Sequence, residues 1–423
     1  MSGVVSQPLP NSWQVKKLRY LTTVLGGGTP DKSKPEFWGG DIPWVSPKDM
    51  KKSEIFQTED CITEEGLQSS ATNLVDPQAV LVVVRSGILR HSIPVAVNMV
   101  PVSLNQDMRA LICGDTISPR YLARFIEGYQ RELLSIWSKE GATVESLDAD
   151  EMASTEIAVP PLPQQALILQ FLDSELAVVD TLIEAKQKLL GLLAEKRRTL
   201  VAEAVMRGLD RSASLRPSRI DWLGDIPAHW EVERSHWLFN ERDERSETGK
   251  EEMLTVSHIT GVTPRSQKDV NMFEAETTAG YKLCFTGDLV INTLWAWMGA
   301  MGTAPVDGIV SPAYNVYTPG PRLLPAYVDA LVRIPVFAQE VTRYSKGVWS
   351  SRLRLYPEGF FETFWPVPPI DEQEQIVARI AEERVKIDKL ANATERSIGL
   401  LKERRSALIA AAVAGQIDIP EAA

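Results

Sequence analysis

The 423-residue sequence contains little cysteine and no long apolar segment. Its three cysteines, Cys61, Cys113 and Cys284, lie far apart and are odd in number, which argues against a disulfide framework or a paired-cysteine metal site. No apolar run approaches the roughly 18 residues that a membrane helix requires, and no basic segment precedes an apolar core at the N-terminus. We therefore expect a cytoplasmic protein that does not associate with a membrane.

An excess of positive charge is also absent, because the formal net charge is −11 at pH 7. Lysine and arginine do not outnumber aspartate and glutamate in any of the four consecutive segments 1–158, 159–215, 216–366 and 367–423. Since the neutralisation of phosphates supplies most nonspecific affinity for nucleic acids, composition alone disfavours nucleic-acid binding. A DNA-binding role would require partner chains that contribute positive charge.

The motifs of common catalytic and metal sites are missing from the sequence. Gly249-Lys250 has no preceding glycine at the spacing of a phosphate-binding loop and is followed by Glu251. There is no G-x-S-x-G nucleophile elbow, and the two Pro-Pro pairs lack the Asn/Asp-Pro-Pro-aromatic pattern of adenine methyltransferases. No metal-ligand spacing is found among the four histidines, His91, His229, His236 and His258. The residues therefore predict neither a catalytic centre nor a metal site.

One short pattern leaves an enzymatic alternative open. Asp31, Asp49 and Lys51 fit a nuclease pattern in which two carboxylates hold a metal ion beside a lysine. The pattern is short enough to occur by chance, and it has no counterpart in the second half of the chain. Its carboxylates also lie among turn residues rather than on predicted strands. We therefore expect these side chains to have no catalytic role.

The sequence repeats itself with a period of about 210 residues. The segment Trp-Gln-Val at 13–15 returns as Trp-Glu-Val at 230–232, and Val-Pro-Pro-Leu at 159–162 returns as Val-Pro-Pro-Ile at 367–370. Each Pro-Pro junction precedes a helical segment that contains an Arg-Arg pair and is closed by a glycine, Gly208 or Gly415. The period is too long for a solenoid and indicates a duplicated unit in which a globular domain is followed by a helix.

The two segments after the junctions carry apolar residues at heptad spacing. The first row contains Leu169, Leu176, Ile183 and Leu190, and the second contains Ile380, Ile387, Leu401 and Leu408, with Leu390 in support. Such spacing places one apolar seam on each helix and is typical of coiled coils. Lys186, Arg197 and Thr394 interrupt the seams, as residues that set the register of a coiled coil can.

Each helical segment spans about 45 residues, or roughly 68 Å at about 1.5 Å per residue, which is longer than a small domain. The chain must return between the two helices, so we expect them to pair as an antiparallel coiled coil. Two amphipathic helices that pack separately on their own domains are the alternative.

The segments 1–158 and 216–366 are predicted to be globular. Short β-rich runs, bounded by turn clusters, lie at 42–46, 80–84, 93–99, 288–291 and 314–317. Helical patterns lie at 119–132 and 325–344. The predicted fold class is therefore mixed α/β: two globular α/β domains are separated by two long antiparallel coiled-coil helices, 159–215 and 367–423, in a pseudo-two-fold repeat.

Polar and aromatic side chains gather in broadly equivalent places of the two globular segments. Arginine pairs well with guanine, asparagine and glutamine pair with adenine, and lysine suits phosphate. In the first segment we predict DNA contacts from Lys32, Lys34, Trp38, Lys48, Lys51, Lys52, Arg85, Arg90, Asn105, Gln106 and Arg109. In the second segment we predict them from His258, Arg265, Lys268, Asn292, Trp295, Trp297, Tyr314, Asn315, Arg343, Lys346, Trp349 and Arg352. Each of these residues could instead be a solvated surface residue or a packed aromatic side chain.

The sequence resembles the specificity subunits of type I restriction–modification systems over nearly its whole length. In the first half the resemblance rests on Ile-Pro-Trp-Val-Ser-Pro-Lys-Asp-Met at 42–50, Ser-Leu-Asn-Gln-Asp-Met-Arg at 103–109 and Gly-Ala-Thr at 141–143. In the second half it rests on Gly-Asp-Leu-Val-Ile-Asn at 287–292 and Gly-Ile-Val-Ser-Pro-Ala-Tyr at 308–314. The Pro-Pro junctions, the long helices and Gly-Gln-Ile-Asp at 415–418 complete it. One departure is Gln164-Gln165, where the family usually has Glu-Gln, as at Glu372-Gln373.

The resemblance implies a non-catalytic subunit in which two target recognition domains each recognise one half of a bipartite target in double-stranded DNA. It implies that the helices set the spacer between the half-sites and dock two modification (methyltransferase) subunits. Those partners would carry S-adenosylmethionine, and separate restriction/translocase subunits would use ATP and Mg²⁺, so that this chain itself binds no cofactor. The methyltransferases would also supply the positive charge that this chain lacks.

Two other classes of protein remain open. A coiled-coil interaction scaffold without direct DNA recognition would explain the helices and the charge, but not the paired polar and aromatic clusters. A self-contained restriction–methylation enzyme would need the methyltransferase motifs that the sequence lacks.

Overall fold

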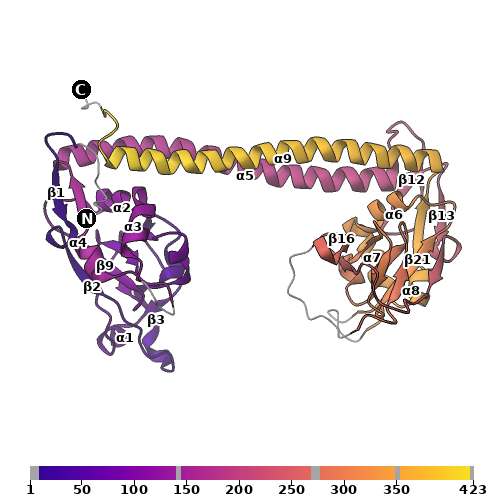
Figure 1. Ribbon diagram of the computed structural model, residues 1–423, viewed down its shortest axis with the longest axis horizontal. Helices are drawn as coiled ribbons and strands as arrows, with labels where there is room; N and C mark the ends of the chain where they lie inside the picture. The colour runs from indigo at the N-terminus through magenta and orange to yellow at the C-terminus, as the bar shows by residue number, and fades with distance from the viewer. Residues whose placement is uncertain (1–8, 140–143, 268–276, 348–352, 420–423) are drawn as a thin grey trace. The chain divides into compact units, whose positions relative to one another are not determined.

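The chain forms two compact units in the computed structural model, which describes residues 9–139, 144–267, 277–347 and 353–419. Unit 1 comprises residues 1–187 and 395–423, and unit 2 comprises residues 188–394. Two long helices, α5 (Leu162–Arg207) and α9 (Ile370–Val413), each run from one unit into the other. Each unit therefore contains a globular part, the first half of one long helix and the last half of the other (Figure 1).

The globular part of unit 1 is built on a five-stranded sheet with the order β2-β9-β6-β7-β4. Its strands are β2 (Thr22–Gly26), β9 (Met108–Cys113), β6 (Val80–Val83), β7 (Val95–Asn98) and β4 (Glu54–Ile55). The central strand β6 pairs antiparallel with β9 and β7, and all four of its residues are buried. A short run of apolar residues forms such a strand because both of its faces are covered.

The two faces of this sheet pack against different elements. One face packs with helix α2 (Pro119–Gly128) and with apolar residues of α5 and α9, in a cluster that includes Val80, Phe125, Leu172 and Ile409. The other face packs against a three-stranded sheet of β5 (Cys61–Ile62), β3 (Trp38–Val45) and β8 (Ser103–Leu104). The remaining elements are the ladder of β1 (Gln14–Lys17) with β10 (Glu156–Val159) and the helices α1 (Glu64–Gln68), α3 (Gln130–Trp137) and α4 (Ala149–Ser154).

Unit 2 repeats this design on a four-stranded sheet with the order β14-β21-β18-β19. Its strands are β14 (Phe239–Arg242), β21 (Tyr314–Pro319), β18 (Leu289–Asn292) and β19 (Met301–Thr303), and β18 is buried throughout. One face packs with α6 (Pro325–Val332), α7 (Pro335–Tyr344) and the long helices. The other face packs with the ladders β15 (Leu254–Ser257)–β16 (Gly261–Pro264) and β17 (Lys282–Cys284)–β20 (Gly308–Val310). The remaining elements are β11 (Leu215–Pro217), β12 (Asp225–Pro227), β13 (Glu231–Arg234), β22 (Phe364–Val367) and α8 (Pro357–Phe361).

The mixed α/β class predicted from the sequence is confirmed. The five predicted β-rich runs overlap β3, β6, β7, β18 and β21. Each of the two predicted helical stretches is divided into two helices, α2 with α3 and α6 with α7. Pro335 explains the second break, because proline has no backbone N–H with which to continue a helix. None of the described helices combines the length and the apolar character that crossing a membrane demands.

A buried glutamine at the start of each long helix attaches that helix to a globular part. The side-chain oxygen of Gln165 accepts from the Ser118 N–H at 2.8 Å, and its amide nitrogen donates to the carbonyl oxygens of Thr116 and Pro160 at 3.0 and 2.8 Å. Gln373 repeats these three bonds in unit 2 at 2.8, 2.9 and 2.9 Å, and both side chains are fully buried. A buried side-chain amide whose oxygen and nitrogen both have hydrogen-bond partners fixes the direction in which a helix leaves its domain.

A buried tyrosine attaches each globular part to the end of the other long helix. In unit 1 the Tyr121 hydroxyl lies 3.0 Å from the Ala158 carbonyl oxygen and 3.3 Å from the Val413 carbonyl oxygen at the end of α9. In unit 2 the Tyr327 hydroxyl donates to the Val205 carbonyl oxygen near the end of α5, at 2.8 Å. These bonds satisfy carbonyl groups that a helix end leaves without partners.

A tryptophan covers the glycine that ends each long helix. Gly208 and Gly415 have φ angles of 75° and 70°, in the left-handed region that favours glycine after a helix C-terminus. A Cβ atom on Gly208 would lie 3.2 Å from the Trp230 ring, and one on Gly415 would lie 3.3 Å from the Trp13 ring. The same closing contact is therefore built twice, once in each unit.

The departure from the family pattern at Gln164 changes one contact of these tryptophans. The Trp13 indole N–H donates to the Gln164 side-chain oxygen at 3.0 Å, as the Trp230 indole N–H donates to Glu372 at 2.9 Å. Glu372 also lies 2.8 Å from His229 Nε2. The tryptophan bond is therefore kept with glutamine, and unit 1 lacks the negative charge and has Ser12 in place of the histidine.

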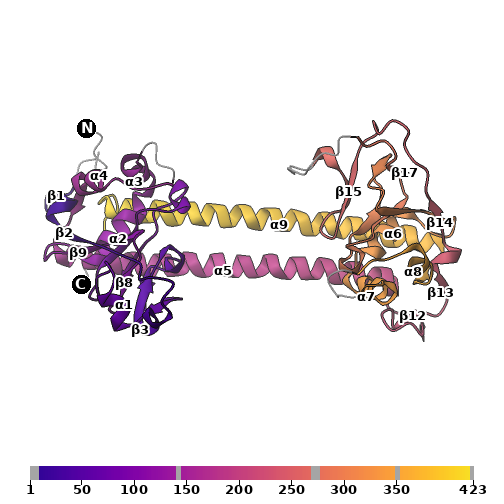
Figure 2. The same ribbon diagram turned by 90° about the horizontal axis from the view of Figure 1, so that it is seen from below.

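The helices α5 and α9 lie side by side and run antiparallel in each unit (Figure 1 and Figure 2). Among the predicted seam residues Leu169, Leu176 and Ile387 are buried, whereas the half-buried ones are Ile183, Leu190, Ile380, Leu401 and Leu408. The prediction for Leu390 was wrong, because this side chain is 47% exposed and the neighbouring Ala391 is half-buried. Thr394 is buried, and its hydroxyl donates to the Leu390 carbonyl oxygen at 2.8 Å.

An Arg–Asp ion pair joins α5 to α9 in each unit. In unit 1 Arg405 Nε lies 3.0 Å from Asp180 Oδ1, and in unit 2 Arg197 Nη1 lies 3.2 Å from Asp388 Oδ1. Both arginines come from the Arg-Arg pairs that the sequence repeats. Arg197, which was predicted to interrupt the apolar seam, therefore forms a polar contact between the helices.

In unit 1 the globular part adds a carboxylate to this pair, whereas in unit 2 the further partner of Asp388 is Arg384 of α9 itself, at 3.6 Å. Glu127 of α2 accepts from Arg405 at 2.5 Å. Burial raises the pKa of Glu127, but Arg124 and Arg405 together outweigh that effect and hold the pKa below its ordinary value. Arg333 occupies the matching place in unit 2, eight residues after the proline that begins the helix. The charge at this place is reversed between the units, so the globular part of unit 2 adds no carboxylate to the Arg197 pair.

We predict that Gln373→Ala lowers the free energy of unfolding by about 1–3 kcal/mol, because buried polar groups lose their partners. The matched control is Gln375→Ala, which removes an exposed side chain two residues along the same helix and should change stability by less than about 0.5 kcal/mol. Urea unfolding followed by circular dichroism measures both variants against the parent chain. Equal stability of the two variants would contradict the attachment role of Gln373.

We predict that Arg405→Met lowers the free energy of unfolding by about 1.5–3 kcal/mol at neutral pH, which is more than Arg197→Met does. The reason is that it leaves the partly buried Glu127 without its Arg405 partner. Arg197→Met should lower the free energy of unfolding by less than about 1 kcal/mol, because the side chains of that pair are 40% and 44% exposed. The pKa of Glu127 is lowered, so its contribution is complete above the ordinary glutamate range and is lost as the pH falls through the lowered pKa. Calorimetry measures both variants, and a larger loss for Arg197→Met would overturn this ranking.

Candidate nucleic-acid interface

Two lysines predicted to contact DNA in unit 1 are held by carboxylates. Lys48 lies on the 3₁₀ turn η3 (Pro47–Asp49) after β3, and its Nζ atom lies 2.9 Å from Asp60 and 3.1 Å from Glu59. Hydrogen bonds to Asp60 and Glu59 raise the pKa of Lys48. Lys51 Nζ lies 3.9 Å from Glu59. Both lysines therefore carry a charge that acidic neighbours already balance.

Of two predicted arginines after β6, Arg85 precedes the 3₁₀ turn η4 (Gly87–Arg90) and Arg90 ends it. Arg85 Nε lies 2.6 Å from Asp107, and Arg90 Nε lies 3.0 Å from Glu145. The arginine side chains are 54% and 68% exposed, so water screens both pairs and each contributes little to stability. Either guanidinium can therefore exchange its carboxylate for a phosphate or a base edge at small cost.

Asn105, Gln106 and Arg109 meet at the turn between β8 and β9. Gln106 is hydrogen bonded to Thr29, and Arg109 Nη1 donates to the Gln106 carbonyl oxygen at 3.1 Å. A Cβ atom on Gly27 would lie 2.1 Å from the Asn105 carbonyl oxygen, so only glycine fits there. The glycine run at 26–28 therefore allows a close approach that brings three predicted residues to one turn.

Three of the predicted lysines of unit 1, namely Lys32, Lys34 and Lys52, are exposed and form no ion pair with a described carboxylate. Lys34 Nζ lies 4.9 Å above the Phe37 ring. The nearby Trp38 donates its indole N–H to the Asp31 carbonyl oxygen at 3.2 Å. These lysines are the free cations that suit phosphate contacts.

The carboxylates of the nuclease alternative are engaged in local turns. Asp31 Oδ1 accepts from the backbone N–H and the hydroxyl of Ser33, at 2.9 and 2.8 Å. Asp49 Oδ2 accepts from the backbone N–H and the hydroxyl of Ser46, both at 2.8 Å, and its Oδ1 atom accepts from the Glu59 N–H at 3.0 Å. Within the described ranges no group of three or more His, Cys, Asp or Glu side chains could hold a metal ion. The pattern Asp31, Asp49 and Lys51 therefore has a structural explanation.

The predicted polar residues on β18 and β21 are largely buried. Asn292 and Asn315 are 7% and 9% exposed. Asn292 Nδ2 donates to the Tyr314 hydroxyl at 3.1 Å. Burial raises the pKa of Tyr314, so this hydroxyl keeps its proton at neutral pH. The two asparagine side chains are therefore too buried for much direct contact with DNA. They lie beneath the surface residues.

Other predicted residues of unit 2 reach the surface from several loops. Trp295 and Trp297 lie on the connection between β18 and β19, which contains the 3₁₀ turn η7 (Ala296–Met298). His258 is exposed after β15, Lys346 is exposed after α7, and Arg265 begins η6 (Arg265–Gln267). Arg343 Nη1 lies 3.7 Å from Asp221 Oδ2. The predicted contacts of Lys268, Trp349 and Arg352 lie outside the described residues.

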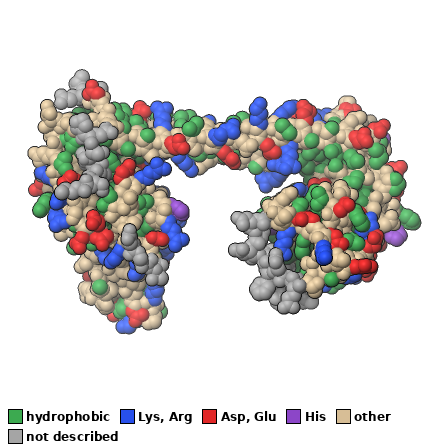
Figure 3. Space-filling view, in the orientation of Figure 1, with side chains coloured by type: hydrophobic (Ala, Val, Ile, Leu, Met, Phe, Trp, Pro, Cys, Tyr) green, Lys and Arg blue, Asp and Glu red, His purple; other side chains and the backbone are tan. Residues whose placement is uncertain are grey.

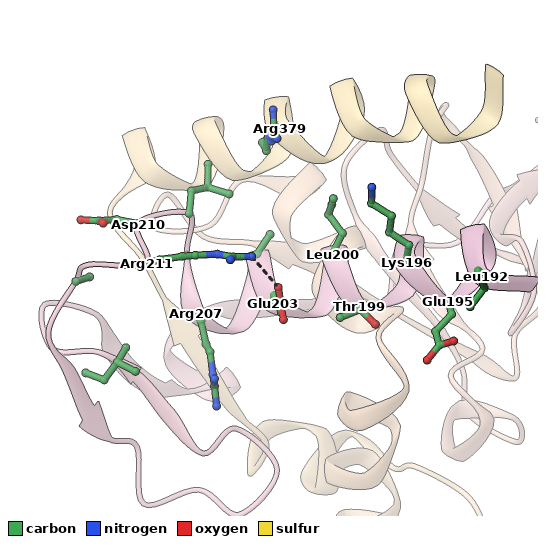
Figure 4. Close-up of a pocket in the computed structure, with 15 residues that line it drawn as sticks. Leu192, Glu195, Lys196, Thr199, Leu200, Glu203, Arg207, Asp210, Arg211 and Arg379 are labelled. Atoms are coloured by element: carbon green, nitrogen blue, oxygen red, sulfur yellow. Dashed lines mark ion pairs between the residues drawn. The ribbon is translucent and has the colours of Figure 1, made fainter. Parts of the chain in front are cut away.

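One pocket of unit 2 involves none of the predicted residues. It has a volume of about 960 Å³ and lies between the last turns of α5, the segment 208–215 and Arg379 of α9 (Figure 4). Basic and acidic side chains alternate around it, and Arg211 lies 4.0 Å from Glu203. This open pocket of mixed charge presents no nucleophile with an adjacent base, and we assign no chemistry to it.

Acidic and basic side chains are also interspersed on the visible face of each unit (Figure 3). This distribution agrees with the ion pairs of Lys48, Arg85 and Arg90 and with the net charge of −11. On this face the described side chains therefore mix both signs of charge. Such a surface can discriminate between ligands more readily than it can attract a polyanion.

The sequence reasoning did not single out several exposed aromatic and apolar residues. Tyr20 and Trp237 occupy matching places, η1 (Leu18–Tyr20) and η5 (Ser235–Trp237), and are 76% and 72% exposed. Leu294 and Met298 flank Trp295 on its loop and are 47% and 37% exposed. An alignment of the two halves of the chain would have revealed the first pair. The exposure of the second pair depends on the loop geometry, which the sequence does not display.

The chain is therefore built by internal repetition, as an α/β domain that occurs twice and is attached each time to the long helices α5 and α9. Residues 10–190 match the family model described as the type I restriction modification DNA specificity domain. The first half of the chain is therefore similar to that domain.

Curated relatives point to the same resemblance. The chain is 39% identical over 212 residues to the specificity subunit of the type I restriction enzyme EcoR124I/EcoR124II from Escherichia coli, a match that covers 50% of this chain and 47% of that protein. It is 31% identical over 186 residues to the type I restriction enzyme MjaIX specificity subunit from Methanocaldococcus jannaschii, which covers 43% and 40% of the two chains. The matches therefore span about half the length of these relatives or less.

Solved structures share the fold over nearly the full length of this chain. A chain from a structure on complex assembly and conformational transition of the type I R-M system superposes with a TM-score of 0.69 at 15% identity, covering 97% of this chain and all of that one. The HsdS subunit from Thermoanaerobacter tengcongensis superposes with a TM-score of 0.52 at 14% identity, covering 97% and 99%. At these identities the likeness concerns the fold.

Proposed function

We propose that this chain is the sequence-specific DNA-recognition subunit of a type I restriction–modification complex and has no catalytic centre of its own. Each globular part recognises one half of a bipartite target in double-stranded DNA. The observation that carries this proposal is the specificity-domain match over residues 10–190, in a chain whose second half repeats the same attachments. The paired contacts of Gln165 with Gln373 and of Tyr121 with Tyr327 support two equivalent recognition domains.

The helix pair sets the spacer between the half-sites and docks two modification (methyltransferase) subunits. Two features support this part of the proposal. First, α5 and α9 are uninterrupted helices of 46 and 44 residues. Second, apolar side chains remain exposed along them after the seam is filled, namely Val178, Leu182, Leu192, Val385 and Leu400, at 59%, 45%, 53%, 68% and 66%. Exposed apolar side chains in this number suit a protein partner.

The chemistry of the complex belongs to its other subunits. The modification subunits carry S-adenosylmethionine and methylate the target, and restriction/translocase subunits use ATP and Mg²⁺. This division is consistent with the local hydrogen bonds of Asp31 and Asp49, which leave neither carboxylate free for a metal ion. It is also consistent with the net charge of −11, because the modification subunits then complete the positive channel around DNA.

We predict that the chain alone binds its target duplex weakly, and that specific binding appears when the modification subunits are added. Mobility-shift titrations with the target duplex and with a duplex in which one half-site is scrambled measure this difference. The affinity of the complex should fall by about 10³–10⁵ between about 50 and 200 mM salt, as for a protein that makes 6–10 phosphate contacts. Equal specific affinity with and without the modification subunits would contradict the proposal.

A coiled-coil scaffold without DNA recognition remains the second proposal. The acidic balance of the chain and the ion pairs of Arg85 and Arg90 favour it. In the same titrations a scaffold predicts that the complex binds the target and the scrambled duplex with equal affinity. A preference for the target that is lost when unit 1 or unit 2 is altered would exclude the scaffold.

A further inference from the structure

The loop between β18 and β19 exposes a cluster of apolar side chains on unit 2. Leu294, Trp295 and Met298 are 47%, 50% and 37% exposed. The run from Leu289 to Ala304 contains no charged residue. Water solvates such a surface poorly, and apolar side chains gathered on one exposed loop mark a place where another molecule binds. We call residues 293–299 the Trp295 loop.

The Trp295 loop is closed by hydrogen bonds. The Asn292 N–H donates to the Ala300 carbonyl oxygen at 3.0 Å, and the Ala300 N–H donates to the Trp295 carbonyl oxygen at 3.1 Å. The Trp297 indole N–H donates to the Leu294 carbonyl oxygen at 3.1 Å. The Trp295 and Trp297 rings lie nearly parallel, with an interplanar angle of 17° and centroids 6.5 Å apart. The loop therefore presents its apolar side chains in one arrangement, and little ordering is required when it binds.

Positive charge without an acidic partner lies beside the Trp295 loop. The Leu355 N–H donates to the Thr293 carbonyl oxygen at 3.1 Å, and the adjacent Arg354 pairs with Lys346 through two backbone bonds of 2.9 Å. Neither Lys346 nor Arg354 forms an ion pair with a described carboxylate. Arg354 lies over the exposed Tyr356 ring, 5.7 Å from its centroid. An apolar tip bordered by free cations is complementary to duplex DNA, which offers stacked bases between two rows of phosphates.

The matching loop of unit 1 has a different chemistry. It joins β6 to β7 and carries Arg85, Arg90 and His91, and its one well-exposed large apolar side chain is Ile88, at 43%. Both arginines are paired with carboxylates. Since the loops occupy the same place in the repeated sheet, the two units present different chemistry at this place.

We propose that the Trp295 loop is a wedge that inserts between two base pairs of the half-site bound by unit 2 and kinks the duplex at that step. This proposal rests on the proposed function, because it requires that unit 2 binds DNA. Lys346 and Arg354 contact the phosphates that flank the opened step. A base step that unstacks readily, such as a pyrimidine–purine step, is then favoured at this place without a direct contact to its base edges. Unit 1 recognises its half-site without such a wedge.

The test uses the full chain assembled with the modification subunits of its own system. The probes are target duplexes, known from the N6-methyladenine positions of the source genome, that carry 2-aminopurine at each step of both half-sites in turn. The parent complex should raise the fluorescence at one step of one half-site, apart from the methylated adenine. Trp295→Ala should remove that rise and weaken binding about 10- to 100-fold, as the loss of one stacked aromatic side chain does. Trp295→Phe should keep most of both.

Two matched variants control for general effects. Trp237→Ala removes a tryptophan of unit 2 that is 72% exposed on another element, and Ile88→Ala alters the matching loop of unit 1. Both should leave the fluorescence signal and the affinity within about twofold of the parent complex. If Trp237→Ala or Ile88→Ala removes the signal as Trp295→Ala does, the wedge is not the Trp295 loop.

The outcomes separate the wedge from the proposed function. If the parent complex prefers its target, but Trp295→Ala binds equally well and no Trp295-dependent signal appears at any step, the wedge is wrong and the proposed function stands. If the parent complex does not distinguish the target from a scrambled duplex, the proposed function fails and the wedge fails with it.

Discussion

Each globular part is fastened to the start of one long helix and to the end of the other, and the rest of the architecture depends on this double attachment. Gln165 and Gln373 hold the helix starts through three buried hydrogen bonds each. Tyr121 and Tyr327 hold the opposite ends. A helix that is fixed at both of its ends keeps its register with an antiparallel neighbour even where the seam between the two is only half-buried. Much of the helix surface is therefore left for other contacts, as the exposed side chains of Val385 and of other residues illustrate.

Several arginine side chains of this molecule pair with its own carboxylates, so their charge is not left free to attract a polyanion. Arg405 and Arg197 pair across the helices, and only the Arg405 pair gains a third member from its globular part. On the surface of unit 1, Arg85 and Arg90 face carboxylates in well-exposed pairs. Such pairs contribute little to stability, so they can open when a stronger ligand arrives. In the proposed function this favours selective binding by a subunit whose partners supply the long-range attraction.

Much of the fold could be predicted from the sequence, because the pattern of a globular domain followed by a long helix occurs twice in it. The Pro-Pro junctions, the heptad rows and the apolar runs of β6 and β18 repeat a local pattern that has one common structural solution. The division of α5 and α9 between two units could not be predicted, since the contacts of Tyr121 with Val413 and of Tyr327 with Val205 join segments far apart in the chain. The error at Leu390 has a similar origin, because strict heptad spacing cannot show where a row moves by one residue.

The candidate site could be predicted less well than the fold. From residue type alone, Lys48, Asn292, Lys32 and Trp295 were all predicted to contact DNA, with no distinction between them. In the structure carboxylates balance the charge of Lys48, and Asn292 is only 7% exposed. Residue type also does not reveal which loops are closed and exposed, as the Trp295 loop is. Ion pairing and burial are properties of the folded chain, and they separate residues that a sequence presents as alike.

The claim at the centre of this account is that the continuous helix pair sets the distance between two independent half-sites. Its most direct test inserts four residues, about one helical turn, into both helices, after Gln187 in α5 and after Thr394 in α9, where the chain passes between the units. The positions of N6-methyladenine are then mapped in cells that express the altered chain with its modification subunits. The account predicts that both half-sequences are unchanged and that the spacer between them grows by about one or two base pairs. Methylation that persists with the original spacer would contradict it.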